Sequence, residues 1–126
     1  MLDVEKYVEH WKKGSSDDWD VAQELIGKGR TRHKLFFAHL ALEKAIKAHI
    51  FRHTHDFPPK IHNLMRLAEL ADFKLGEHQQ QVLSEMNRFN IEGRYADMLG
   101  PEPTQQDALY YQQRAREVYE WLMKQL

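Results

Sequence analysis

The stretch from Thr31 to Thr54, TRHKLFFAHLALEKAIKAHIFRHT, constrains the fold of this chain more than any other. It contains neither glycine nor proline and is mostly apolar, which predicts one long helix buried over most of its circumference. A line of four polar side chains runs along it: Arg32, His39, Glu43 and Lys47. On a helix that turns about 100° per residue, the last three lie about −20°, +20° and +60° from Arg32. All four therefore project from one side.

That polar line has two interpretations. The interior of a bundle or a dimer interface could bury it as a satisfied network, because Glu43 and Lys47 form an i, i+4 ion pair and His39 lies one turn before Glu43. Alternatively, the line borders a ligand groove, since coupled titratable groups on one helix also occur in binding sites. Both interpretations remain open from the sequence.

The segment before the central helix predicts two shorter helices. Apolar residues spaced by three and four run up to Gly14, which is expected to end the first helix. Ser15 or Ser16, followed by Asp17 and Asp18, is typical of an N-cap and an acidic first turn, so a second helix is expected to start there. The residues 27–29, with sequence GKG, are expected to cap it.

The segment after the central helix predicts three more elements. Pro58 and Pro59 forbid continuation of the central helix. A short helix with an apolar face from Ile61 to Ala71 follows, and Gly76 separates it from a helix that carries Val82 to Phe89. The stretch from Asn90 to Pro103 is expected to be a connector, and Thr104 with Asp107 resembles a capping box for the last helix. No segment alternates with period two, so the chain is predicted to be all-α, a bundle of four to five helices in one domain, residues 1–126.

Composition excludes several classes of function. The 18 basic and 19 acidic residues give a net charge of −1, so no bulk attraction to nucleic acid or to an acidic membrane is expected, although a local basic patch stays open. The absence of cysteine excludes disulfides, thiolate metal sites and cysteine nucleophiles. No apolar run reaches the roughly 20 residues of a membrane span, and the first residues lack the layout of a signal peptide. A cytoplasmic location is expected.

Three tracts together resemble a known family. They are FFAHLALEKAIKAHI at 36–50, PPKIHNL at 58–64 and FNIEGRYAD at 89–97, followed by a terminal helix rich in Tyr and Gln. In this order and spacing they resemble the HEPN family, the higher eukaryotes and prokaryotes nucleotide-binding domain. The resemblance implies an up-and-down helical bundle, a homodimer and a nucleotide- or nucleic-acid-binding module. It also implies a minimal nucleotidyltransferase as partner, in a pair of the toxin–antitoxin type.

The resemblance also bears on catalysis. The RNase branches of the family place Arg, four to six residues and then His near the start of a late helix, where His moves a proton and Arg stabilises the charged transition state. The corresponding segment here, RFNIEGRYAD at 88–97, contains no His, which argues against an enzyme. Tyr95 is a partial match to the Tyr that the partner transferase modifies in one branch. The alternative is a metal-independent ribonuclease whose Arg and His motif differs from that of the RNase branches. It would use Arg32 or Arg94 as electrophile and His39 or His62 as acid and base.

The candidate nucleotide-binding residues fall in three groups. Arg94, Tyr95 and Asp97 stand in the glycine-flanked connector, where they could hold a phosphate, stack on a base and bind a ribose hydroxyl. They could equally cap a helix and pack on the core. His62 and Asn63 follow the two prolines at the start of a helix, where capping is the more common role. The third group comes from the polar line: His39, Glu43 and Lys47.

The remaining histidine cluster does not predict a metal site. His49 and His53 are spaced i, i+4 and His55 follows, but Asp56 is the only carboxylate that joins them. No metal and no cofactor are expected. A third interpretation of the whole chain is a helical interaction protein without a ligand.

Overall fold

The computed structural model describes residues 3–25, 30–94 and 102–126, with the backbone alone for 91–94. Within these residues the chain forms five helices and no strand. They are α1 (Val4–Glu24), α2 (Thr31–Thr54), α3 (Leu64–Leu70), α4 (Glu77–Arg94) and α5 (Gln105–Lys124). The prediction of an all-α helical bundle is confirmed.

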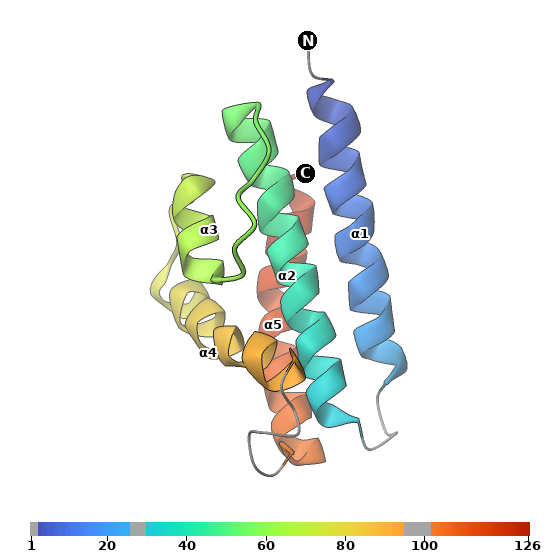
Figure 1. The fold of residues 1–126 in the computed structure, drawn as a ribbon. Helices are drawn as coiled ribbons and strands as arrows, with labels where there is room; N and C mark the ends of the chain where they lie inside the picture. Colours follow the sequence, from blue (N-terminus) through green and yellow to red (C-terminus); the bar gives the residue numbers. More distant parts are fainter. Residues whose placement is uncertain (1–2, 26–29, 95–101) are drawn as a thin grey trace.

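Helix α2 is the centre of the bundle. Helix α1 lies along one side of it, α5 lies behind it, and α3 and α4 cover the other side (Figure 1). Its apolar side chains Leu35, Leu42 and Ile46 have no exposed surface. Each buried aliphatic side chain of this size contributes on the order of 2 kcal/mol. Because α1, α3, α4 and α5 all pack on α2, many of its polar residues are buried as well, among them His39, Glu43 and Lys47.

The predicted break at Gly14 is wrong, because α1 continues through it. Gly14 faces α2, and a Cβ added there would lie 3.2 Å from Lys44 Cδ. The next residue, Ser15, is fully buried and its Oγ donates a hydrogen bond to the Ala41 carbonyl at 2.6 Å. Gly14 and Ser15 are therefore small residues at a close helix contact. The loss of helix propensity at a glycine, about 1 kcal/mol, is offset by this packing.

The end of α2 and the start of α3 follow the predicted signals. Helix α2 ends at Thr54, and His55 adopts the left-handed conformation with φ 58°, as expected one residue past a helix end. The two prolines then lead in extended chain to Asn63, the N-cap of α3.

The boundary between α4 and the connector differs from the prediction. Helix α4 continues to Arg94, whereas the sequence suggested a connector from Asn90. Asn90 is only 6% exposed and stands one turn after buried Met86, so it extends the buried face of α4. The predicted capping box of α5 is confirmed, since Thr104 Oγ1 accepts from Asp107 N at 3.0 Å and Asp107 Oδ2 from Thr104 N at 3.4 Å.

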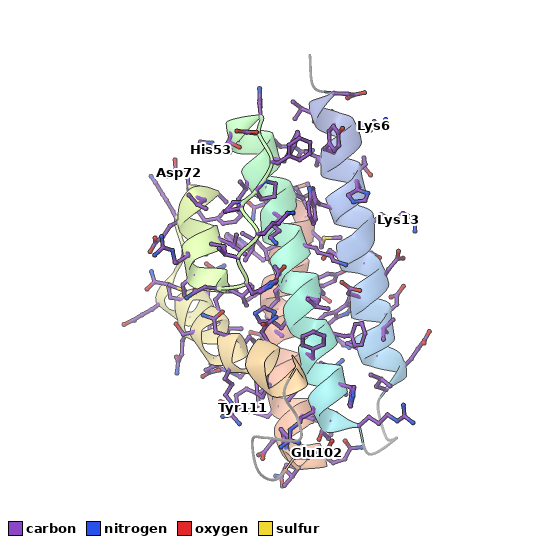
Figure 2. All side chains as sticks on the ribbon, viewed as in Figure 1. Lys6, Lys13, His53, Asp72, Glu102 and Tyr111 are labelled. Carbon is purple, nitrogen blue, oxygen red and sulfur yellow. The ribbon has the colours of Figure 1, made fainter. Side chains whose placement is uncertain are left out.

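Aromatic side chains join α1 to α5. The Trp19 and Tyr119 rings stack with centroids 4.5 Å apart, as expected for aromatic residues near the two ends of the chain. On the outer side of α1, Lys6 and Lys13 project away from the bundle (Figure 2). No helix among the described residues is both long enough and apolar enough to cross a membrane.

Candidate functional site

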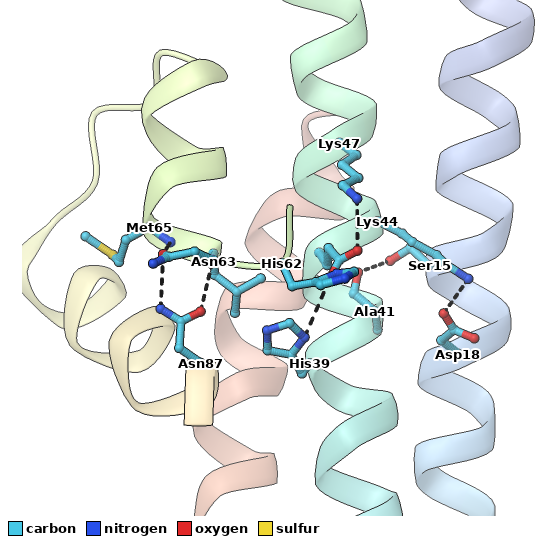
Figure 3. Close-up of polar contacts among 12 residues, drawn as sticks. Ser15, Asp18, His39, Ala41, Lys44, Lys47, His62, Asn63, Met65 and Asn87 are labelled. Carbon is cyan, nitrogen blue, oxygen red and sulfur yellow. Dashed lines mark hydrogen bonds and ion pairs between the residues drawn. The ribbon is translucent and has the colours of Figure 1, made fainter. Parts of the chain in front are cut away.

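A buried carboxylate, that of Glu43, organises the polar centre of the molecule. Its Oε2 lies 3.0 Å from Lys47 Nζ, and its Oε1 lies 3.0 Å from His62 Nδ1. His39 Nδ1 lies 3.8 Å from the same Oε1 (Figure 3). Glu43, Lys47 and His39 are 5%, 6% and 0% exposed. The interior of the bundle thus buries most of the predicted polar line, which is the first of the two interpretations.

The position of Lys47 is fixed from two directions. Besides the ion pair with Glu43, its Nζ lies 5.7 Å from the centre of the Trp11 ring on α1. A cation over an indole face gains further electrostatic stabilisation. The ammonium is therefore neutralised within the fold and is not directed at solvent.

His62 is the member of this network that reaches the surface. It stands in the extended segment before α3, and 45% of its side chain is exposed. Because a carboxylate oxygen only accepts, the hydrogen bond to Glu43 requires a proton on Nδ1 of His62. In the neutral ring the other nitrogen, Nε2, is then an acceptor available to a ligand or a proton.

Two asparagines hold the first turn of α3 beside His62. Asn63 Oδ1 accepts from Met65 N at 3.0 Å and from Arg66 N at 3.2 Å, which is an N-cap. Asn87 on α4 donates to that oxygen at 3.2 Å and accepts from Leu64 N at 2.8 Å. The capping interpretation of Asn63 is confirmed. Its Oδ1 is fully used, so its amide NH₂ group is the part left for a ligand.

Two pockets meet at His62 and Asn63. The smaller, about 190 Å³, is lined by these two residues with Asn87 and Asn90. The larger, about 600 Å³, extends along α3, and its other lining residues are Pro59, Ile61, Arg66, Glu69 and Leu70. Small-molecule sites usually measure about 300–1,000 Å³, so the volume of the larger pocket falls within the range of a small-molecule site.

The structure brings together only part of the predicted site. His39, Glu43, Lys47, His62 and Asn63 form one contiguous cluster. Arg32, by contrast, is at the first turn of α2 and is 6% exposed. Arg94 ends α4, its side chain is not described, and Tyr95 and Asp97 lie outside the described residues.

His49, from the histidine cluster, has a structural role. It is 9% exposed, and its Nε2 donates to the Leu122 carbonyl on α5 at 2.8 Å. Burial lowers the pKa of His49, although the hydrogen bond to Leu122 acts in the opposite direction. Across the described part of the chain, no group of three His, Asp or Glu side chains is arranged to hold a metal ion.

Comparison with known proteins gives the family. The profile of the HEPN domain matches residues 8–126, nearly the whole chain. The protein belongs to the HEPN domain family. A comparison with curated proteins gave no match.

Two solved structures share the HEPN fold of this chain. The crystal structure of TT1696 from Thermus thermophilus is similar with a TM-score of 0.78 and 20% sequence identity, over 94% of this chain and 98% of that one. The structure of ST0689, described as an archaeal HEPN homologue, has a TM-score of 0.72 and 20% identity, over 94% and 96% of the two chains. At this identity the similarity establishes the fold and leaves ligands unassigned.

Three residues of the candidate site were not predicted from the sequence: Arg66, Asn87 and Asn90. Asn87 and Asn90 are three residues apart, and Asn90 is also four after Met86, so it occupies the apolar face of α4. An asparagine on such a face is a signal for a specific polar contact. This signal was not recognised because Asn90 was expected to lie in a connector and not on a helix.

Proposed function

We propose that this HEPN domain binds a nucleotide or a short single-stranded RNA in the two pockets that meet at His62. The observation that supports this most is the His62 imidazole, which is half exposed and is held in one orientation by a buried carboxylate. A fixed imidazole at the junction of two pockets is pre-organised for a ligand, because its rotamer is set before binding.

The pocket residues suit the parts of a nucleotide. The amide groups of Asn63, Asn87 and Asn90 can donate and accept along the edge of a base. Arg66 lines the larger pocket and can pair with a phosphate in bidentate geometry. His62 stands between them and can stack on the base or hydrogen-bond the sugar.

The buried residues have a supporting role in this proposal. Glu43 holds His62, Lys47 neutralises Glu43, and His39 lies 3.8 Å from the same carboxylate. Since they are at most 6% exposed, they act on the ligand through His62. Arg94, Tyr95 and Asp97 remain candidates for further contacts.

The proposed biological role follows the family resemblance. We propose that the domain forms a homodimer and works as an accessory or partner of a minimal nucleotidyltransferase, in a pair of the toxin–antitoxin type. Co-expression with a transferase encoded beside it, followed by size-exclusion chromatography, tests both assemblies.

Calorimetric titration tests the binding site. AMP, ATP and a single-stranded RNA oligonucleotide are titrated into the wild type, His62→Ala and the control His78→Ala. The control is matched, since His78 also pairs with a carboxylate, Glu117 at 2.9 Å, but on the exposed surface between α4 and α5. His62→Ala should weaken binding at least tenfold, a loss of about 1.4 kcal/mol, and His78→Ala should not. Absence of binding with every probe, or equal loss in both variants, rejects the proposal.

A second candidate function is metal-independent RNA cleavage. The specific observation is again the Glu43–His62 pair, because a carboxylate that orients an imidazole is the usual arrangement around a general base. RNA incubated with the purified protein in EDTA should then be degraded by the wild type and not by His62→Ala. If the RNA stays intact with the wild type, the cleavage function is rejected and nucleotide or RNA binding remains as the proposed function.

A further inference from the structure

Among the described residues, several buried polar groups on α1, α2 and α5 lack hydrogen-bond partners. Lys34 on α2 is 1% exposed, and its Nζ has no hydrogen-bond partner within the described chain. Gln112 on α5 is 3% exposed, and neither its oxygen nor its nitrogen is bonded to any described group. The Nε2 of Gln23 on α1 is also buried and has no hydrogen-bond partner among the described residues.

Arg116 connects these groups. Its Nη2 donates to Gln23 Oε1 at 2.9 Å, and it stands one turn after Gln112 on α5. Burial lowers the pKa of Lys34, and the charge of Arg116 lowers it further. We call these four residues, Lys34, Gln23, Gln112 and Arg116, the Lys34 cluster.

The other two lysines of α2 each have a carboxylate partner, unlike Lys34. Lys44 pairs with Asp18 at 2.7 Å, and Lys47 pairs with Glu43 at 3.0 Å. Lys34 is more deeply buried than either and has no such carboxylate among the described residues. Removing an ammonium from water without a partner is strongly unfavourable. A cluster with an unbonded ammonium and unbonded amide donors therefore lacks an anionic acceptor.

We propose that the Lys34 cluster is a binding site for a phosphate group. The cluster contributes an ammonium, a guanidinium and two amides from three helices, and these are the donor types that bind phosphate oxygens. Gln112 and Arg116 also line a surface pocket of about 470 Å³, so the α5 part of the cluster borders solvent. Glu117 and Glu120 line the same pocket, so the phosphate is expected at the Gln112 end.

This site is separate from the proposed nucleotide pocket. Gln23 and Arg116 of the Lys34 cluster belong to α1 and α5, whereas His62 belongs to the segment before α3 and contacts Glu43. Helices α1 and α3 lie on opposite sides of α2 (Figure 1). The two sites share no residue, so loss of one leaves the other intact.

Thermal unfolding with added phosphate tests the proposal. The melting temperature of the wild type and of Lys34→Met is measured in rising inorganic phosphate, with chloride replaced to hold the ionic strength constant. The wild type should gain stability as phosphate binds the folded state, and Lys34→Met should not. Without phosphate, Lys34→Met should melt at the same or a higher temperature, because an unpaired buried cation has been replaced by an apolar side chain of similar length.

Three further measurements complete the test. Arg116→Met, a change at an exposed side chain, should weaken phosphate binding at least tenfold in calorimetry without unfolding the protein. The control Lys13→Met removes an exposed lysine and should keep the full response. AMP in place of inorganic phosphate shows whether the group is bound free or as part of a nucleotide, and either result supports the site. A wild type that does not respond to either probe, a response retained in Lys34→Met, or a phosphate-free Lys34→Met less stable than the wild type overturns the proposal.

Discussion

Replacing Glu43 by glutamine tests whether the buried network stabilises the bundle. The side chains of Glu43 and Lys47 are 6% and 7% exposed, and their charges lie 3.0 Å apart. With an effective dielectric constant of about 20, the attraction between them is about 5–6 kcal/mol. Desolvation cancels much of that gain, but removal of one partner leaves the other charge buried and uncompensated. We expect Glu43→Gln to lower the free energy of unfolding by about 3–5 kcal/mol, a large share of the stability of a domain of this size.

A double-mutant cycle separates the pair from the rest of the network. Urea denaturation followed by far-ultraviolet circular dichroism gives the free energies for the wild type, Glu43→Gln, Lys47→Met and the double variant. Because the substituted amide can still accept from His62 and no charge is left buried, the double variant should be more stable than Glu43→Gln, with a coupling of at least about 2 kcal/mol. Asp17→Asn, which removes the exposed ion pair with Lys13, is the control and should change stability by less than about 0.5 kcal/mol. The reasoning is refuted if Glu43→Gln costs less than about 1 kcal/mol or if the coupling is near zero.

Three further predictions concern the helix contacts. Ser15→Val should cost about 1–3 kcal/mol in urea denaturation, because it overpacks the contact with Ala41 and removes a buried hydrogen bond, whereas a cost below about 0.5 kcal/mol would argue against close packing there. Since the pKa of His49 is lowered in the fold, its contribution to stability is full above its ordinary pKa of 6.5 and is lost as the pH falls below it. His49→Gln, which can still donate to Leu122, should therefore lose less stability than the wild type between about pH 7 and pH 5, by at most about 1.4 kcal/mol per pH unit, and equal slopes would contradict this. Asn63→Ala should cost about 1–2 kcal/mol through loss of the α3 cap, measured by the same denaturation, and a neutral result would show that Asn87 caps the helix alone.

The long central helix was predictable because its signals are local. Thr31 to Thr54 contains no helix breaker, two prolines follow, and the predicted and observed bounds agree. The break at Gly14 was predicted wrongly for a physical reason. A glycine followed by Ser-Ser-Asp-Asp has the chemistry of a cap and also that of a close helix contact. Asp18, expected in an acidic first turn, instead pairs with Lys44 on α2.

The site was predictable only in its parts. The helical repeat places His39, Glu43 and Lys47 on one side of α2, but it does not say whether that side faces solvent. The contact between Glu43 and His62 depends on how the chain reverses after α2, and no local pattern encodes that reversal. No sequence pattern pointed to Lys34, because its lack of a hydrogen-bond partner among the described residues depends on how three helices pack.

The two sides of α2 differ in how their buried charges are neutralised, and this difference separates stability from binding. Glu43 is satisfied by Lys47 and His62, so a change there removes stability first and affects a ligand only through the orientation of His62. Lys34 lacks an acceptor within the described chain, so a change there should leave the free protein as stable or more stable while it removes phosphate binding. Glu43→Gln should therefore lower both stability and ligand binding, whereas Lys34→Met should lose phosphate binding without losing stability. That contrast would distinguish a structural charge from a ligand-binding charge on the same helix.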